Sequence, residues 1–403
     1  MPSHSSGTRT RRAGRRLAAA LALAGALGAA AACAPSTTGT GAGGGPEAGS
    51  GARPPVVDKD FDLGKLIAAA KKDGSVTVYD STGDITKTAA AFTAEYGIKA
   101  TGVKSKVGDT LEKMTRENQG GNVTIDVTFY EDGPSLVGQL LAQKVVYTWI
   151  PGDLVQDIPP AGRNPLQVLS KGNLFVYNPR LFPDGCPVHN IWDLADPAWK
   201  GKVALQDPLS KPNIVEFFNQ LKSGGESRLR EAYKAKYGKD LPAGDSAAET
   251  WVERLAENSP ILTSSDDDAA AAVAAPNQRK ERVALVSNAK FRDVKDKNYH
   301  MRVCAGMQPW AGYQYPKYAA IATKTEHPDA AKLFVYFMLT QAGVDTQMNT
   351  GGVPGNPRLE RGAFMPDGLT DWKRQLFVFD PAKLPSDFAD LQAMQDLWRL
   401  NHG

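Results

Sequence analysis

Ser75 to Gly97, SVTVYDSTGDITKTAAAFTAEYG, is the stretch from which the fold is predicted. Its apolar, β-forming start is typical of a short strand, and apolar side chains spaced by three and four residues from Ile85 to Tyr96 are typical of one helix face. The closing glycine ends that helix. The polar turn STGD (81–84) places hydroxyls and backbone N–H groups where small ligands sit in open α/β sheets.

Strand-like and helix-like segments alternate further along the chain. This alternation predicts the α/β class, with a mostly parallel sheet covered on both faces. Residues 164–178, NPLQVLSKGNLFVYN, are extended, and we interpret them as a first crossing into a second lobe. The other segments are IKATGVKS (98–105), GDTLEKMTRENQGG (108–121), IDVTFYED (125–132), GPSLVGQLLAQKVV (133–146), ILTSS (261–265) and RVALVS (282–287).

The first 32 residues have the pattern of an export signal. Arginines precede the apolar run Leu17–Ala32, which is short for a membrane span. The three alanines before Cys33 resemble the lipobox of bacterial lipoproteins, although leucine is usual at the first of them. We expect removal of residues 1–32 and acylation of Cys33. Ordinary secretion is the alternative, and the choice between Sec and twin-arginine export stays open.

Residues 33–55 are rich in Gly, Ser, Thr and Pro and show no apolar period. They predict a flexible tether behind the acylated cysteine. With the lipid anchor, this tether would hold the exported protein at the outer face of the bacterial cell membrane.

The charge balance argues against a nucleic-acid partner. The chain has 47 basic and 44 acidic residues, but five arginines lie in the segment expected to be removed. The remaining 42 basic and 44 acidic residues give a net charge of −2, so no attraction to nucleic acid is expected.

The folded part contains two cysteines, Cys186 and Cys304. An exported, oxidising location favours a disulfide between them. Two buried free thiols are the open alternative.

Two motifs resemble the bacterial extracellular solute-binding proteins of ABC importers, in the group that includes ferric-iron, thiamine and phosphonate binders. The first is IWDLADPAWKGKVALQDP (191–208), and the second is TEHPDAAKLFVYFMLT (325–340). They occur in the family's order, behind a lipoprotein leader, and the resemblance covers about residues 74 to 356. Most of these motif residues, such as Trp192 and Phe334, are expected to pack in the core.

The resemblance implies a two-lobe periplasmic-binding-protein type II fold, with hinge crossings and a ligand cleft between the lobes. We expect lobe 1 to begin with residues 56–170, lobe 2 to comprise 171–305, and 306–403 to return to lobe 1 and end in a helix. The implied partners are a small solute, an ABC permease and its ATPase, and we expect a monomer. A sensory role without a transporter is not distinguished from transport.

Ligand contacts are expected from loops at strand ends in both lobes and from the return segment. Each candidate could instead cap a helix or pack a crossing strand. The candidates are Ser81, Thr82, Gly83, Tyr130, Glu131, Asp132, Ser210, Asn213, Asn288, Trp310, Tyr313 and Tyr315.

These candidates suit a small polar or zwitterionic organic solute. Ser and Asn side chains at helix starts favour a phosphate, phosphonate or carboxylate group. Glu131 and Asp132, beside aromatic candidates, favour an amine through ion pairing and cation–π contact.

Ferric iron is the alternative ligand. A ferric ion prefers phenolate, imidazole and carboxylate ligands, and the family's iron binders supply an adjacent tyrosine pair. This sequence has no Tyr-Tyr, and its STGD turn has no histidine. One residue separates Tyr313 from Tyr315, and we expect their side chains on opposite faces of a strand. We therefore expect neither a metal site nor a cofactor.

The sequence does not predict an enzyme. It has no G-x-S-x-G, H-E-x-x-H or C-x-x-C motif, and the folded part has only four histidines. A secreted hydrolase remains as the competing hypothesis, and no catalytic residue is assigned.

Overall fold

The stretch Ser75 to Gly97 folds as predicted into strand β2 (Ser75–Asp80) and helix α2 (Ile85–Tyr96). Alternate residues of β2 are buried, as expected for a strand with one face in the core. Gly97 adopts a left-handed conformation, with φ of 69°, and its N–H bonds to the carbonyl of Thr93 to end the helix.

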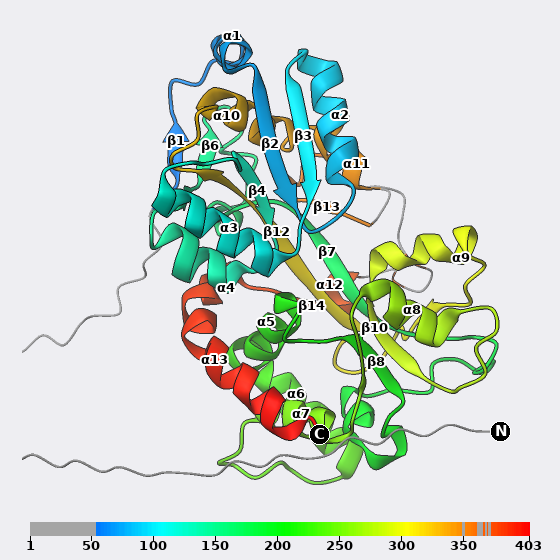
Figure 1. Cartoon of the computed structure of the whole chain (residues 1–403). Helices are drawn as coiled ribbons and strands as arrows, with labels where there is room; N and C mark the ends of the chain where they lie inside the picture. Colours follow the sequence, from blue (N-terminus) through cyan, green and yellow to red (C-terminus); the bar gives the residue numbers. More distant parts are fainter. Residues whose placement is uncertain (1–53, 349–350, 361–365, 367–368, 370–371) are drawn as a thin grey trace, which may run out of the picture. The chain divides into compact units, whose positions relative to one another are not determined.

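The computed structural model describes residues 54–348, 351–360, 366, 369 and 372–403 (Figure 1). The predicted signal peptide, Cys33 and nearly all of the tether lie outside these residues. Within the described ranges, no helix combines the length and the apolar character needed to span a bilayer.

The sequence forms the following strands and helices. The strands are β1 (Val56–Asp58), β2, β3 (Lys99–Lys104), β4 (Val127–Tyr130), β5 (Val146–Tyr147), β6 (Trp149–Pro151), β7 (Leu166–Tyr177), β8 (Val203–Gln206), β9 (Ile261–Thr263), β10 (Val283–Ser287), β11 (Arg302–Val303), β12 (Gly312–Ala322), β13 (Val353–Pro354) and β14 (Phe377–Val378). The helices are α1 (Leu63–Asp73), α2, α3 (Val107–Gly120), α4 (Gly133–Ser135), α5 (Pro212–Gln220), α6 (Glu226–Tyr237), α7 (Ala247–Glu257), α8 (Asp266–Ala274), α9 (Arg292–Asp296), α10 (Pro328–Phe337), α11 (Gln341–Met348), α12 (Trp372–Gln375) and α13 (Leu384–Asn401).

The main sheet has the strand order β3-β2-β4-β12-β7-β10-β8-β9. Its outer pairs are parallel, as the strand–helix alternation predicts. The long strands β7 and β12 instead run antiparallel to each other and to β4 and β10. The expectation of a mostly parallel sheet therefore holds for each side but not for the middle.

Strands β7 and β12 join two α/β halves, and we call them the crossing strands. Lobe 1 surrounds β2 to β4, and lobe 2 surrounds β8 to β10. The class predicted from the sequence, a two-lobe α/β fold with crossing segments, is confirmed. The expected boundary between residues 170 and 171 lies inside β7 itself.

Each lobe has its own hydrophobic core. In lobe 1, Phe92 packs against Phe334 and Phe337 of α10. In lobe 2, the fully buried Trp192 donates its ring N–H to the carbonyl of Leu229 at 2.9 Å. The expectation that the two motifs mainly supply core residues is thus confirmed at Trp192 and Phe334.

A disulfide joins Cys186 to Cys304, which are 118 residues apart. Both cysteines belong to the core of lobe 2 or pack against it. The bond ties the loop after β7 to the segment that follows β11.

Replacing both cysteines, as in Cys186→Ser/Cys304→Ser, should lower the free energy of unfolding. Removing a cross-link that closes so long a loop typically costs about 2–4 kcal/mol, chiefly because the unfolded chain gains freedom. Scanning calorimetry should show a lower unfolding temperature for the variant and no effect of reductant on it. An unchanged unfolding temperature would contradict this role.

The C-terminal helix α13 packs against both lobes, touching α4 on one side and α5 and α7 on the other (Figure 1). Phe388 of α13 lies so close to the backbone at Gly138 that a Cβ added there would collide with its ring. Glycine is therefore required at position 138. Asp387 is buried on this helix and accepts a hydrogen bond from Gln220 Nε2 at 2.6 Å. Burial raises the pKa of Asp387 to about 7, with nearby Asp390 adding to the shift.

The raised pKa of Asp387 predicts how stability depends on pH. An aspartate in an unfolded chain has a pKa of about 3.9, so the folded protein holds an extra proton between about pH 4 and 7. The stabilising contribution of that proton is complete at low pH and is lost as the pH rises through about 7. Asp387→Asn should therefore lose less stability than the wild type between pH 5 and 8 in urea unfolding. Asp396→Asn, which changes a carboxyl on the same helix whose side chain is 45% exposed, is the matched control, and an identical pH profile for both variants would contradict the assignment.

Candidate functional site

A group of buried charges lies where the crossing strands pass the ends of β2 and β4. Lys317 on β12 is completely buried, and its Nζ lies 2.6 Å from Asp80 Oδ1 and 3.1 Å from Glu131 Oε1. Lys171 on β7 lies 3.6 Å from Asp84 Oδ2. We call these five residues the crossing-strand cluster. The cluster attaches both crossing strands to lobe 1 through charges shielded from water.

The two lysines of this cluster differ in their electrostatic environment. Burial lowers the pKa of Lys171, and the positive charge of Lys317 lowers it further. Burial also acts against the charged form of Lys317, but Asp80 and Glu131 outweigh it and raise the pKa of Lys317. Lys317 therefore stays protonated between its two carboxylates.

The predicted candidates in the first loop gather around Asp80. The Thr82 N–H donates to Asp80 Oδ1 at 2.9 Å, and the Ser81 hydroxyl donates to the same oxygen at 3.4 Å. Gly83 is exposed. The loop that was predicted to attract an anion thus already donates an N–H group to a carboxylate at the end of β2.

The structure separates the three candidates that follow β4. Tyr130 is buried in the lobe 1 core and donates its hydroxyl to the carbonyl of Val107 at 3.2 Å. Asp132 caps α4 by accepting the N–H of Ser135 at 3.0 Å. Glu131 alone among the three faces Lys317. The predicted amine site around this trio therefore reduces to Glu131.

In lobe 2, the candidates at the start of α5 also differ in position. Ser210 is exposed, and its hydroxyl donates to the carbonyl of Asp207 at 2.9 Å. Asn213 is buried and accepts a hydrogen bond from the Tyr313 hydroxyl at 2.9 Å. Nearby, Lys211 Nζ lies 2.8 Å from Asp266 Oδ1 and so joins the starts of α5 and α8.

The aromatic candidates of the return segment are largely packed in lobe 2. Trp310 is buried against Phe377, and Tyr313 is stacked between Phe217 and Phe379, with ring centroids 4.4 and 5.3 Å away. Their main contacts are with the hydrophobic core.

Tyr315 differs from its neighbour in its hydrogen bonding. Among the described residues, its hydroxyl has no hydrogen-bond partner. The expectation that Tyr313 and Tyr315 point to opposite faces is wrong, because residues i and i+2 of a strand share a face. Their ring centroids are 6.0 Å apart.

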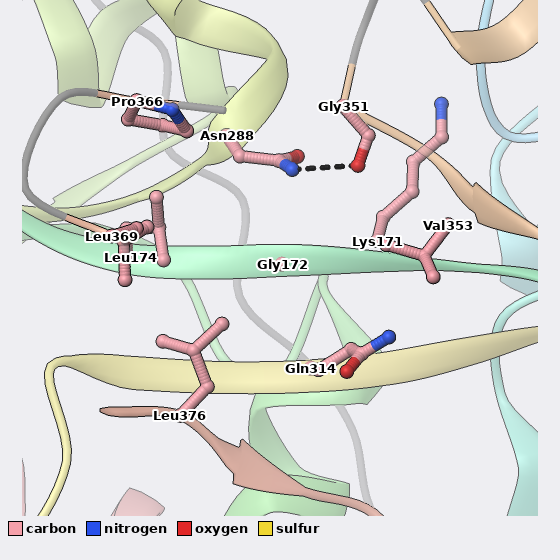
Figure 2. Close-up of a pocket in the computed structure, with 10 residues that line it drawn as sticks. All are labelled: Lys171, Gly172, Leu174, Asn288, Gln314, Gly351, Val353, Pro366, Leu369 and Leu376. Atoms are coloured by element: carbon pink, nitrogen blue, oxygen red, sulfur yellow. Dashed lines mark hydrogen bonds between the residues drawn. The ribbon is translucent and has the colours of Figure 1, made fainter. Parts of the chain in front are cut away.

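Asn288, at the end of β10, links the two lobes. Its Nδ2 donates to the carbonyl of Gly351 at 2.8 Å, and Gly351 belongs to the loop after α11 in lobe 1 (Figure 2). Gly351 has φ of 78°, and a Cβ there would collide with the Asn288 amide. Glycine is therefore required both by the backbone conformation and by this close contact.

A narrow cavity of about 20 Å³, room for roughly a single water molecule, lies beside the crossing strands and is partly open to solvent. Most of its wall is apolar, and its polar side chains come from the two crossing strands and from lobe 2. Figure 2 shows Asn288 and Gln314 on either side of the β7 backbone at Gly172. The lining residues are Lys171, Gly172, Leu174, Asn288, Gln314, Gly351, Val353, Pro366, Leu369 and Leu376.

Sequence reasoning missed the lysines and aspartates of the crossing-strand cluster. A signal was present, because Lys317 interrupts an otherwise uncharged strand, GYQYPKYAAIA, that is buried along its whole length. A lysine is almost never fully buried without a charged partner. The residues that pair with Lys317 are more than 180 positions away in the sequence, so no local pattern identifies them.

The comparisons with known proteins agree with this architecture. The iron-bound HitA of Pseudomonas aeruginosa is 21% identical, with a TM-score of 0.63, covering 81% of this chain and 99% of its own. AfuA of Actinobacillus pleuropneumoniae, solved with fructose-6-phosphate, is 19% identical, with a TM-score of 0.59 and coverages of 81% and 99%. The ferric binding protein of Campylobacter jejuni is 15% identical, with a TM-score of 0.61 and coverages of 80% and 99%.

These similarities to solved structures establish the fold alone. No curated protein sequence matches the chain. The family model described as bacterial extracellular solute-binding protein matches residues 87–373, which is well over half of the chain. The chain therefore belongs to the family of bacterial extracellular solute-binding proteins, the binding components of ABC importers.

Proposed function

We propose that this protein binds a small polar or zwitterionic organic solute between its lobes and delivers it to an ABC permease driven by its ATPase. The observation that carries the proposal is the meeting of polar groups from both lobes at the crossing strands. Asn288 from lobe 2 donates to the carbonyl of Gly351 from lobe 1. Lys171 and Gln314 of the crossing strands line the same cavity. A solute that touches both lobes would stabilise only the closed form and so shift the population towards it.

The anchoring of the protein is part of the same proposal. Acylation of Cys33 would hold a monomer at the outer face of the cell membrane, and residues 34–55 would tether it there. The composition of this segment supports a flexible link. The two lobes could then reach the permease while remaining attached to the membrane.

Ferric iron is a weaker candidate, although two of the structural neighbours named above are ferric-iron proteins. A ferric site would draw on phenolate ligands. Burial raises the pKa of Tyr313 and Tyr315 well above the usual value, and carboxylates such as Glu131 and Asp266 raise both further. Among the described residues, no group of three or more His, Cys, Asp or Glu side chains could hold a metal.

A hydrolase is also disfavoured. The family consists of binding proteins, not enzymes. The ion pairs described at the crossing strands join lysines to carboxylates, and none of them includes a histidine, the residue most often used for acid–base chemistry.

Mass spectrometry of the tag-purified, processed protein should detect a bound small organic molecule. Small-angle scattering should show a more compact protein with this solute than after its removal, because the solute would contact both lobes. The same protein unfolded in urea, dialysed and refolded is the solute-free control. Tight binding of ferric ion alone, with no organic solute retained, would refute the organic-solute assignment.

The contact between Asn288 and Gly351 predicts a second result. Asn288→Ala should weaken solute binding about five- to tenfold, because removing one interlobe hydrogen bond costs about 1 kcal/mol in the closed form. Calorimetric titration of the solute recovered above measures this change. Asn277→Ala, which alters an exposed asparagine beyond the end of α8, is the matched control. Equal affinities for the two variants would show that the contact does not contribute to closure.

A further inference from the structure

One edge of the sheet in lobe 2 collects basic side chains. It is formed by four segments, which follow β7 (178–180), precede β8 (200–202), precede β10 (279–282) and lead into β11 (300–302). We call these four segments the basic edge. Their arginines and lysines are Arg180, Lys200, Lys202, Arg279, Lys280, Arg282 and Arg302.

Strand pairing places the four segments next to one another. Tyr177 at the end of β7 is the register partner of both Val283 in β10 and Arg302 in β11. Val283 is in turn paired with Val203 in β8, and its N–H donates to the carbonyl of Lys202 at 3.0 Å. Because neighbouring strands lie about 4.8 Å apart, the basic edge extends over about 14 Å from β11 through β7 and β10 to β8.

The basic side chains of this edge are available to a partner. All of them are exposed except Arg282, which is half-buried. Within the part of the chain that the structure describes, none of them takes part in an ion pair. Lys202 lies over the ring of Trp199, with its Nζ 6.0 Å from the ring centroid. The charges of the basic edge are therefore not neutralised by the protein's own carboxylates.

The positive charge of this edge is a local excess. Within the four segments the only carboxylate in the sequence is Glu281. Extending each segment by four residues on either side adds Lys297 and three carboxylates, Asp184, Asp196 and Asp296. An excess of four positive charges then remains, in a chain whose net charge without residues 1–32 is −2. The basic edge is therefore a positive face on a protein that is slightly negative as a whole.

Two partly exposed aromatic rings lie beside these charges. Trp199 immediately precedes Lys200, and its ring centroid lies 6.5 Å from that of Phe182, which follows Arg180 by two residues. Tryptophan is enriched where proteins meet the interface between a bilayer and water, and lysines and arginines there are attracted to anionic headgroups. A row of charges with an aromatic pair at its side therefore suits an extended lipid surface.

The basic edge lies at the opposite ends of the strands from the candidate site. Strands β8 and β10 run parallel away from this edge and end at Gln206 and Ser287. A strand of five residues such as β10 spans about 16 Å. The candidates Ser210, Asn213 and Asn288 follow the far ends of these strands, so a surface held against the basic edge would leave them free.

We propose that the basic edge binds anionic lipid headgroups of the membrane to which the protein is expected to be anchored. The lipid expected on Cys33 would keep the folded part close to this surface, and the basic edge would turn lobe 2 towards it. The attraction is electrostatic, so salt weakens it. The proposal does not depend on the solute, and its failure would leave the proposed function standing.

Vesicle sedimentation tests this interaction. The processed chain with Cys33→Ser carries no acyl group, so any binding must come from the protein itself. It should sediment with vesicles made of phosphatidylglycerol and phosphatidylcholine in equal parts at low salt. It should stay in solution with phosphatidylcholine vesicles, or when the salt concentration is high. No sedimentation with the anionic vesicles would overturn the proposal. Binding to soluble polyglutamate without binding to these vesicles would also overturn it, in favour of an acidic protein partner.

Two triple variants with the same change in net charge locate the interaction. Lys200→Gln/Lys202→Gln/Lys280→Gln should weaken vesicle binding about hundredfold, because each lysine near an anionic surface strengthens binding about fivefold. The control Lys71→Gln/Lys72→Gln/Lys87→Gln changes exposed lysines of α1 and α2, and it should bind as the unsubstituted protein does. Equal weakening by both variants would assign the binding to net charge instead of the basic edge. Undiminished binding by the first variant would remove the basic edge from the interface.

Discussion

The ion pairs of Lys317 are the interaction on which the arrangement of this protein depends. A buried ammonium is tolerated only with compensating charges, and removing one partner of a buried pair typically costs about 3–5 kcal/mol. Lys317 meets Asp80 at the end of β2 and Glu131 after β4, so the register of β12 against lobe 1 is fixed at this point. Once this register is set, the positions of Gln314 and Tyr315 along the same strand follow.

The fold was largely predictable because it is encoded by local patterns. The strand–turn–helix from Ser75 to Gly97 and the core residues Trp192 and Phe334 follow from periodicity and from motif resemblance. The middle of the sheet was not predictable in the same way. A buried strand reads as an apolar run whether its neighbours are parallel or antiparallel, so the antiparallel pairing of β7 with β12 left no separate signal.

The site was only partly predictable, since its contacts join distant parts of the chain. Glu131, Asn213 and Asn288 were proposed from their places at strand and helix ends, and they do lie near the crossing strands. Tyr130 and Trp310 have the same residue types as ligand-binding aromatics, but tertiary packing places them in the cores. The residue types at a strand end therefore indicate the region of a site. The direction in which each side chain points depends on contacts with distant residues, which the local sequence does not reveal.

The internal pairing of charges has a consequence for selectivity. Most of the lysines and carboxylates near the crossing strands neutralise one another, so their number alone says little about what the protein binds. In the proposed site, selectivity would then come from unsatisfied acceptors in the cavity wall, because leaving a buried acceptor unpaired costs about 1–3 kcal/mol and a fitting donor recovers it. Asn288 combines both tasks, since its Nδ2 links the lobes while its Oδ1 has no hydrogen-bond partner among the described residues. If the proposed solute binds at this Oδ1, ligand recognition and lobe closure would be coupled through one side chain.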